Sequence, residues 1–365
     1  MKPIKVLMLV PNLRVSNGVT SFVMNYFNDI NHQRVQMDFA LYSDRETPYY
    51  ETVKQQGGKI FILPSIKNLS AHIKECNKIL AEGHYDIIHD NTLHVSIPMV
   101  WCAKRFGISV RILHSHNSKM GETATKELRN KMLLPILRAL ATDYAACSQL
   151  AARAMFGRRD FTVIPNVIQT EKYKFDSAAR ERIRKNMNVT DKYVVGTVGR
   201  LAEQKNPFFA VDVFACLLKK CPNAEYWWAG SGPLQNQVRA YVEEKGLSEH
   251  VKLLGSRENV LELYQGMDAF FLPSLFEGLP LTGVEAQAMG LPMVVSDTVT
   301  DEMVYTDLVD YVGLDAPVEV WVEHLQKALN RNVERAEYTH ELERSEFSNT
   351  GCGEKLMEIY RTMLE

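Results

Sequence analysis

Short apolar segments alternate with amphipathic segments of helical period through most of the chain. The first apolar segment, Lys5 to Val10, is followed by a loop and by Val19 to Ile30, where apolar residues recur with the period of a helix. Further apolar segments of strand length lie at Met37 to Leu41, Lys59 to Leu63, Asp86 to His89, Val110 to Leu113, Tyr144 to Cys147 and Thr162 to Ile164. Parallel strands need crossover connections, so this alternation predicts a parallel sheet with helices on both faces.

A second series of the same kind follows the polar stretch 169–192. Strands are predicted at Tyr193 to Val198, Glu225 to Ala229, Val251 to Leu254, Ala269 to Leu272 and Met293 to Val295. Helices are predicted at Pro207 to Lys219, Leu234 to Lys245, Val260 to Gly266 and Leu281 to Met289. The predicted fold class is therefore α/β, with two doubly wound domains facing each other across a cleft. We place the domains at residues 1–168 and 169–345, and expect 346–365 to form a helix that packs back on the first domain.

Composition narrows the class of protein. The 365 residues are 46% hydrophobic and 24% charged, which is typical of a soluble globular protein. No apolar run is long enough to span a bilayer, and the apolar part of the first ten residues is too short for a signal peptide, so we expect a cytoplasmic location. The six cysteines are scattered, and no His/Cys cluster has zinc spacing. We therefore expect reduced thiols and no metal site.

Charge is distributed unevenly along the chain. Residues 1–168 contain 21 Lys and Arg against 13 Asp and Glu, a net charge of +8, whereas the remainder has 21 against 31, a net charge of -10. A basic first half could face an anionic membrane surface or an anionic substrate. Charge scatter without a partner is the alternative.

The stretch from Pro273 to Pro292 holds the first candidate chemistry. It follows a predicted strand and reads as a loop and a helix, with Glu277 in the loop and Glu285 about one turn inside the helix. Pro280 suits a helix start, and Gly290 a helix end. The first amides of such a helix, those of Leu281, Thr282 and Gly283, have no partner within the helix and can hold a phosphate. The alternative is that Glu277 only favours the helix dipole and Glu285 points to solvent.

A basic loop follows the first strand of the second domain. In VVGTVGRLAEQKNP the strand ends at Gly199, and Arg200 and Lys205 precede a helix that starts near Pro207. Two cations beside a helix start could neutralise a diphosphate, Arg200 by bidentate hydrogen bonds and Lys205 as a point charge. Solvated surface charges are the alternative.

Three further loops follow predicted strands, where ligands bind in open sheets of this kind. RILHSHNSKM delivers His114, His116 and Asn117 at a strand end, where a neutral imidazole could contact a substrate hydroxyl or stabilise a developing charge. Structural histidines are the alternative. AGSGPL contains Gly230, which lets backbone approach a ligand closely or simply serves a tight turn. In PNLRVSNGVTSF, Gly18 opens the first helix and could admit an anion.

These motifs carry a resemblance to a known family. The segment EGLPLTGVEA at Glu277 to Ala286, GRLAEQKNP at Gly199 to Pro207, AGSGPL and HSHN together resemble the retaining nucleotide-sugar glycosyltransferases of family 4. Members of that family have the GT-B fold of two Rossmann-like domains. The resemblance covers nearly the whole chain, with the motifs in the right order, and it is closest to bacterial enzymes of exopolysaccharide and capsule synthesis.

The resemblance implies a role for each matching residue. Glu285 matches the glutamate that holds the ribose hydroxyls, and Arg200 and Lys205 match the basic pair on the donor diphosphate. His116, not His114, falls at the position of the family's active-site histidine, and Glu277 matches the glutamate that contacts the donor sugar. The predicted catalytic residues are thus His116 and Glu277, and the predicted donor-binding residues are Gly18, Arg200, Lys205, Gly230, Leu281, Thr282 and Glu285. The segment Asn17 to Thr20 departs from the G-G-x-E of many relatives.

The implied activity is retaining hexosyl transfer from a nucleotide-diphosphate sugar to a glycan or lipid-linked acceptor. A UDP-sugar is favoured over a GDP-sugar, and no cofactor, metal or nucleic acid partner is expected. The sequence has no D-x-D, the usual metal-binding signature of the other major glycosyltransferase fold. A nucleotide-sugar 2-epimerase or an inactive nucleotide-sugar-binding relative is the alternative. A periplasmic sugar-binding protein is disfavoured because no signal peptide is recognised.

The segment KELRNKMLLPILRAL, Lys126 to Leu140, combines four cations with a broad apolar face. Such a helix could lie on an anionic bilayer, as a peripheral contact near a lipid-linked acceptor. A core-facing helix with solvated charges is the alternative.

Overall fold

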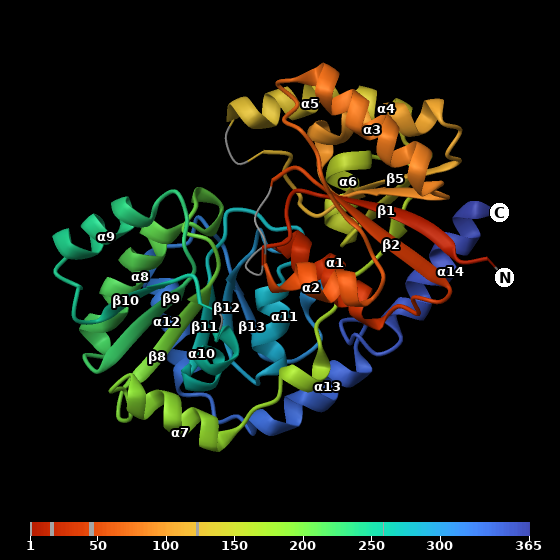
Figure 1. Cartoon of the computed structure of the whole chain (residues 1–365). Coiled ribbons are helices and arrows are strands. Elements are labelled where there is room, and N and C mark those ends of the chain that lie inside the picture. Colours follow the sequence, from red (N-terminus) through yellow and green to blue (C-terminus); the bar gives the residue numbers. More distant parts are fainter. Residues whose placement is uncertain (1, 15–17, 44–46, 122–123, 258) are drawn as a thin grey trace. The chain divides into compact units, whose positions relative to one another are not determined.

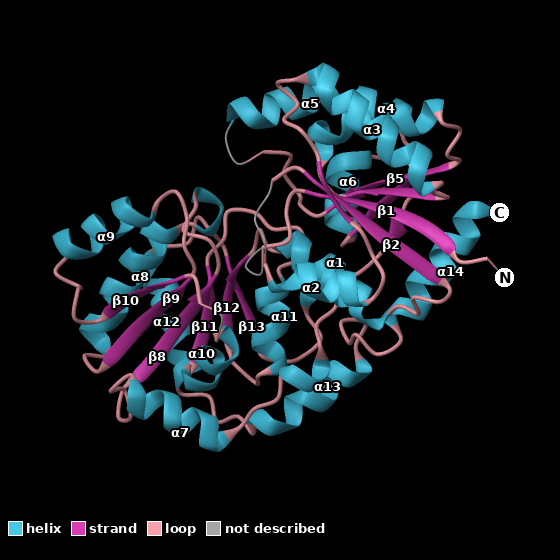
Figure 2. Cartoon of the chain, in the orientation of Figure 1, coloured by secondary structure: helices cyan, strands magenta, loops and turns pink. Residues whose placement is uncertain are grey.

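The computed structural model describes residues 2–14, 18–43, 47–121, 124–257 and 259–365 (Figure 1). The chain forms two compact units. The first contains the residues up to Val167 together with Asn349–Glu365, and the second contains Ile168–Ser348. The strands of each unit gather into one sheet that lies between helices (Figure 2). Residues 15–17 belong to the predicted loop before Gly18, and they lie outside the described residues. They include Asn17, the first residue of the segment that departs from the family pattern.

The first unit is built on a parallel sheet with the strand order β3-β2-β1-β4-β5-β6-β7. Its strands are β1 Ile4–Val10, β2 Val35–Leu41, β3 Ile60–Ile62, β4 Ile87–Asp90, β5 Val110–Ser115, β6 Asp143–Ala146 and β7 Thr162–Val163. Its helices are α1 Gly18–Asp29, α2 Pro48–Gln55, α3 Leu69–Gly83, α4 Ile97–Arg105, α5 Ala124–Leu140, α6 Gln149–Phe156 and α14 Cys352–Leu364. The order reverses beside β1, whose neighbours are β2 and β4.

Alternation along β1 divides the core of this unit into two layers. Val6 and Met8 pack in one buried cluster with α1 and α14, whereas Leu7 and Leu9 pack in another with α3 and α4. Successive side chains of a strand point to opposite faces, so one continuous apolar strand serves both layers. The C-terminal helix α14 belongs to the first layer through Tyr360, which is fully buried.

The second unit is built on a parallel sheet with the strand order β10-β9-β8-β11-β12-β13. Its strands are β8 Tyr193–Val198, β9 Ala224–Ala229, β10 Val251–Gly255, β11 Ala269–Leu272, β12 Met293–Ser296 and β13 Val309–Val312. Its helices are α7 Ser177–Asn186, α8 Pro207–Lys220, α9 Gln235–Glu244, α10 Val260–Gly266, α11 Leu281–Ala288, α12 Val318–Leu329 and α13 Tyr338–Arg344. The order reverses between β8 and β11, so the loops that follow these two strands meet at the point where open sheets bind ligands.

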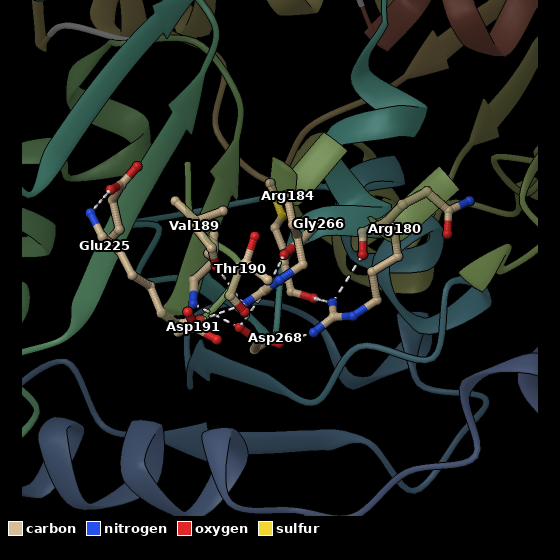
Figure 3. Close-up of polar contacts among 12 residues, drawn as sticks. Arg180, Arg184, Val189, Thr190, Asp191, Glu225, Gly266 and Asp268 are labelled. Atoms are coloured by element: carbon tan, nitrogen blue, oxygen red, sulfur yellow. Dashed lines mark hydrogen bonds and ion pairs between the residues drawn. The ribbon is translucent and has the colours of Figure 1, made fainter. Parts of the chain in front are cut away.

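An ionic network lies at the opposite end of this sheet, beside the N-terminal ends of its strands. Asp268, just before β11, pairs with Arg180 and Arg184 of α7 and accepts a hydrogen bond from the Val194 amide at 2.8 Å (Figure 3). Arg184 also donates to the Gly266 carbonyl at 2.7 Å and to the Val189 carbonyl at 2.9 Å. The network connects α7 with α10 and with the start of β8. It does not involve the C-terminal ends of the strands.

The predicted fold class is confirmed, because both units are α/β structures with parallel sheets. Strand β13 was not predicted. Within the described residues, no helix is both long enough and apolar enough to cross a membrane.

Candidate active site

At the start of α11, two backbone amides and one hydroxyl group have no hydrogen-bond partner among the described residues. Pro280 is the residue before the helix, and Gly290 takes a left-handed φ of 63° just after it. The amides of Leu281 and Thr282 have no acceptor among the described residues, and the buried Thr282 Oγ1 has no hydrogen-bond partner there either. The Gly283 amide, expected as a third donor, instead donates to the Pro280 carbonyl at 2.9 Å. Two amides and one hydroxyl therefore remain at the positive end of the helix dipole.

The loop after β8 brings a cation to the Pro273–Pro280 loop. Lys205 lies in a 3-10 turn, Glu203–Lys205, and its Nζ is 2.6 Å from Glu277 Oε1. Gln204 Nε2 donates to Glu277 Oε2 at 3.1 Å and to the Phe276 carbonyl at 3.1 Å. The side chains of Lys205 and Glu277 are only 12% and 7% exposed, so this ion pair is largely shielded from water. Glu277 is held by the basic loop, and a helix-dipole role alone does not explain its contacts.

Arg200 occupies the same loop but has an exposed side chain. It precedes the turn that holds Lys205, and its carbonyl accepts a hydrogen bond from the Ala202 amide at 2.8 Å. An ammonium group has three N–H donors, and the pair with Glu277 accounts for one of those on Lys205. The loop therefore offers two kinds of cation, one exposed and one fixed by a neighbouring carboxylate.

Gly230 has a role in packing this loop. Its φ of 141° is a conformation that other residues rarely adopt, and a Cβ at this position would overlap the Gly199 carbonyl. The two loops are further joined by hydrogen bonds from Leu201 N to the Ser231 carbonyl at 3.2 Å and from Leu234 N to the Leu201 carbonyl at 3.0 Å. The glycine thus allows two backbones to meet, and this contact positions the segment that carries Arg200.

Glu285 is enclosed, so the alternative that it points to solvent is wrong. Tyr173 donates to its Oε1 at 2.7 Å, and Tyr264 donates to its Oε2 at 2.7 Å. Burial raises the pKa of Glu285 above its ordinary value, while the two tyrosines and the charge of Lys205 oppose that rise. Neither tyrosine was predicted as a site residue, because Tyr173 lies 112 residues from Glu285 in the chain and no local pattern links them.

His116 and Gly18 belong to the first unit. His116 follows β5, and its ring stacks on that of His114 with centroids 4.1 Å apart. Its Nε2 lies 2.7 Å from Asn91 Oδ1, and burial lowers its pKa to about 3. Gly18 is the first residue of α1, and a Cβ there would meet open space.

The predicted site residues of the second unit thus lie on the loops at the carboxyl edge of its sheet and at the start of α11. They are Arg200, Lys205, Gly230, Glu277, Leu281, Thr282 and Glu285. Among the described residues, no group of three or more His, Cys, Asp or Glu side chains is arranged to hold a metal ion.

A chain of two α/β units, each built on a parallel sheet, has the GT-B fold of glycosyltransferases. Residues 179–344 match the family model described as glycosyl transferases group 1, and the chain belongs to this family. It is 30% identical over 336 residues to EpsF of Bacillus subtilis (strain 168), which is named as a glycosyltransferase; the match covers 89% of this chain and 88% of that protein.

Two further comparisons concern a second relative and a solved structure. The chain is 25% identical over 279 residues to a UDP-Gal:alpha-D-GlcNAc-diphosphoundecaprenol alpha-1,3-galactosyltransferase of Escherichia coli, covering 72% of each protein. The crystal structure of Anabaena HepE in complex with UDP-glucose has the same fold, with a TM-score of 0.80, 18% identity, and 98% of this chain and 100% of that chain covered.

Proposed function

We propose that this protein is a retaining glycosyltransferase that moves a hexose from a nucleotide-diphosphate sugar, preferentially a UDP-sugar, to a glycan or lipid-linked acceptor. The observation that carries the proposal is the start of α11, where two amides and a buried hydroxyl without acceptors lie in the unit that also fixes Lys205. A diphosphate supplies the negative oxygens that these donors lack. The names of relatives support a role in exopolysaccharide or capsule synthesis, because one of them is the capsular polysaccharide biosynthesis glycosyltransferase CapH of Staphylococcus aureus.

The proposed chemistry follows from charge. Cleavage of the bond between sugar and phosphate builds negative charge on the leaving diphosphate. Arg200, Lys205 and the amides of Leu281 and Thr282 stabilise that charge, and Lys205 and the two amides need little reorganisation because they are fixed in advance. In the same proposal Glu277 accepts hydrogen bonds from hydroxyls of the donor sugar, and Glu285 accepts hydrogen bonds from hydroxyls of the ribose. His116 contacts the transferred sugar.

Retention of configuration and independence from metal are part of the proposal. The retaining course is inferred from family 4, and cations of the protein take the place of a metal at the diphosphate. Transfer in the presence of EDTA tests the second point, and the anomeric configuration of the product tests the first.

Turnover of a nucleotide sugar tests the proposed function. UDP- and GDP-sugars are first screened by thermal shift, and the best donor is then incubated with lipid-linked and glycan acceptors while diphosphate release and product mass are followed. We expect stoichiometric release of nucleoside diphosphate and transfer of one hexose. A free isomerised nucleotide sugar would indicate the 2-epimerase, and binding of every donor without turnover would indicate an inactive relative.

We also propose that α5 makes a peripheral contact with an anionic membrane at the cytoplasmic face. Leu134 and Leu137 are buried, whereas Leu128, Met132 and Ile136 are 62%, 71% and 47% exposed. The three exposed side chains are spaced four residues apart and share one face of the helix. A core-facing helix with solvated charges does not account for this second apolar face. The surrounding Lys126, Arg129 and Lys131 are exposed and suit anionic headgroups.

A further inference from the structure

Three histidines form a stacked column inside the first unit. His89 lies in β4, His114 in the neighbouring β5, and His116 two residues further on, so the three rings share one face of the sheet. The ring centroids of His89 and His114 are 5.1 Å apart with an interplanar angle of 11°, and a hydrogen bond of 2.9 Å joins His89 Nε2 and His114 Nδ1. The ring centroids of His114 and His116 are 4.1 Å apart with an angle of 13°. Phe22 of α1 contacts His114 and His116 edge-on. The column fixes the plane of the His116 ring.

Asn91 fixes which nitrogen of His116 carries the proton. Its side-chain Nδ2 donates to the His89 carbonyl at 3.2 Å, which orients the amide. Its Oδ1 therefore faces His116 Nε2, at 2.7 Å. A carbonyl oxygen can only accept, so His116 must donate from Nε2. In a neutral ring this leaves Nδ1 with a lone pair.

The surroundings of His116 keep the ring neutral. Burial lowers the pKa of His116 to about 3, and it also lowers the pKa values of His114 and His89. The other titratable group of the column is the Tyr360 hydroxyl of α14, bound to His89 Nδ1 at 2.8 Å, whereas Asp90 follows His89 in β4 and so points to the opposite face of the sheet. Burial raises the pKa of Asp90 to about 6, and its carboxylate is bound by Ser96 and Thr92.

We propose that Asn91 is a positioning residue that holds His116 as the neutral Nε2–H tautomer, so that Nδ1 accepts a hydrogen bond from a hydroxyl of the sugar substrate. This inference rests on the proposed function for its substrate, but the tautomer is a property of the ligand-free protein. In this scheme the neutral His116 ring accepts a hydrogen bond. It does not act as a cationic imidazolium that stabilises the leaving group. Asn91 has no side-chain contact with substrate in this scheme and acts through His116.

Two substitutions separate the tautomer from the charge. Asn91→Ala removes the acceptor for the Nε2 proton, so His116 can carry its proton on Nδ1 instead. Nδ1 then has no lone pair with which to accept a hydrogen bond from the substrate. Asn91→Asp keeps an acceptor but adds a negative charge near the ring, which favours the imidazolium and raises the pKa of His116 by roughly 1 to 3 units. Asn68→Asp is the matched control, because Asn68 is exposed at the start of α3 and Asp caps a helix equally well.

The tautomer is read by ¹⁵N NMR of the ligand-free protein, with His116 assigned from the spectrum of His116→Gln. We expect the wild type and Asn68→Asp to show the Nε2–H form with no titration of His116 between pH 5 and 8. Asn91→Ala should show Nδ1–H and a fall in kcat of at least ~10-fold, the scale of one lost hydrogen bond, with little change in the KM for the donor.

Asn91→Asp should give a pH-dependent rescue. Its activity should approach that of the wild type at pH 8.5, where His116 is neutral, and fall between about pH 6 and pH 4 as the ring gains a proton. Asp90 also titrates in this range, so the two profiles are compared as a ratio and the protonation of His116 is followed by ¹⁵N NMR in the same samples. A purely structural role of Asn91 would leave this ratio independent of pH.

The inference is overturned if wild-type His116 carries its proton on Nδ1, or if Asn91→Ala retains both the Nε2–H form and normal kcat. Failure of the proposed function gives a different result. In that case no donor is turned over by the wild type, while the NMR assignment of His116 still decides whether Asn91 sets the tautomer.

Discussion

Lys205 and Glu277 form a largely buried pair, so a change in either residue acts on the other. Loss of one partner leaves a charge in a shielded place, which destabilises the protein more than loss of an exposed pair does. Variants at this site therefore need a check of folding before their activity is interpreted.

Removing the charges at the site should reduce transfer strongly. We expect Glu277→Ala, Arg200→Ala and Lys205→Ala each to lower the rate of transfer by at least ~100-fold, the scale of a lost contact to developing charge. Glu203→Ala and Lys220→Ala are matched controls, since both side chains are exposed in the same unit, and they should retain normal rates. Initial rates are compared at equal fractions of folded protein, judged by circular dichroism. Near-normal rates in all three site variants would refute the assignment of the site.

Residue types and their order predicted on which loops the candidate site residues lie, but not how their side chains pair. Glu277, Arg200 and Lys205 were recognisable because turn residues and helix starts have local signatures. Tyr173, Tyr264 and Asn91 had none, because each contacts its partner across a distance in sequence that only the folded sheet closes. The bond from the Gly283 amide to Pro280 depends on the exact conformation of the first turn, which composition does not specify.

At the scale of elements, the contact between the loops after β8 and β9 determines where the basic segment lies. Gly230→Ala would place a methyl group against the Gly199 carbonyl, and the loop would have to move. We expect at least ~10-fold weaker binding of nucleoside diphosphate, measured by calorimetry, because a displaced loop loses at least one charged hydrogen bond.

Gly246→Ala is the matched control for this change. Gly246 also has a left-handed φ, 68°, but a Cβ there would meet nothing within 4 Å. Its cost is backbone strain of about 1 kcal/mol, without a change in affinity. Equal affinities of the two variants would show that the contact between the loops does not position the site.

Most elements could be predicted because buried parallel strands are continuous apolar runs. The predicted helix Val260–Gly266 matches α10 residue for residue, and Leu281–Met289 is within one residue of α11. Strand β13 escaped prediction because its sequence, VDYV, places an acidic residue in a short and only partly buried strand at the edge of the sheet. Its pairing with β12 is a tertiary effect.

At the scale of the whole molecule, the basic first half and the exposed apolar face of α5 predict weak, salt-sensitive binding to anionic vesicles. Each Lys or Arg near an anionic surface contributes about 1 kcal/mol, and salt screens that contribution. We expect sedimentation with phosphatidylglycerol vesicles at low salt, release at high salt, and at least ~10-fold weaker binding of the double variant Met132→Glu, Ile136→Glu.

Leu364→Glu is the control for this double variant. Leu364 is 37% exposed at the end of α14, so the change adds a similar charge outside α5. It should bind as the wild type does. If the folded wild type does not sediment with vesicles at low salt, α5 is not a membrane contact.

The central claim is that the carboxyl edge of the second unit's sheet binds the diphosphate of a nucleotide sugar. The most direct measurement is calorimetric titration of the protein with UDP and GDP, each compared with its nucleoside, for the wild type, Lys205→Ala and Lys220→Ala. With at least two charged contacts to the diphosphate, one nucleoside diphosphate should bind at least ~100-fold more tightly than its nucleoside. Most of that difference should disappear in Lys205→Ala but not in Lys220→Ala. Equal affinities for diphosphate and nucleoside, or no binding of either diphosphate by the folded protein, would contradict the account.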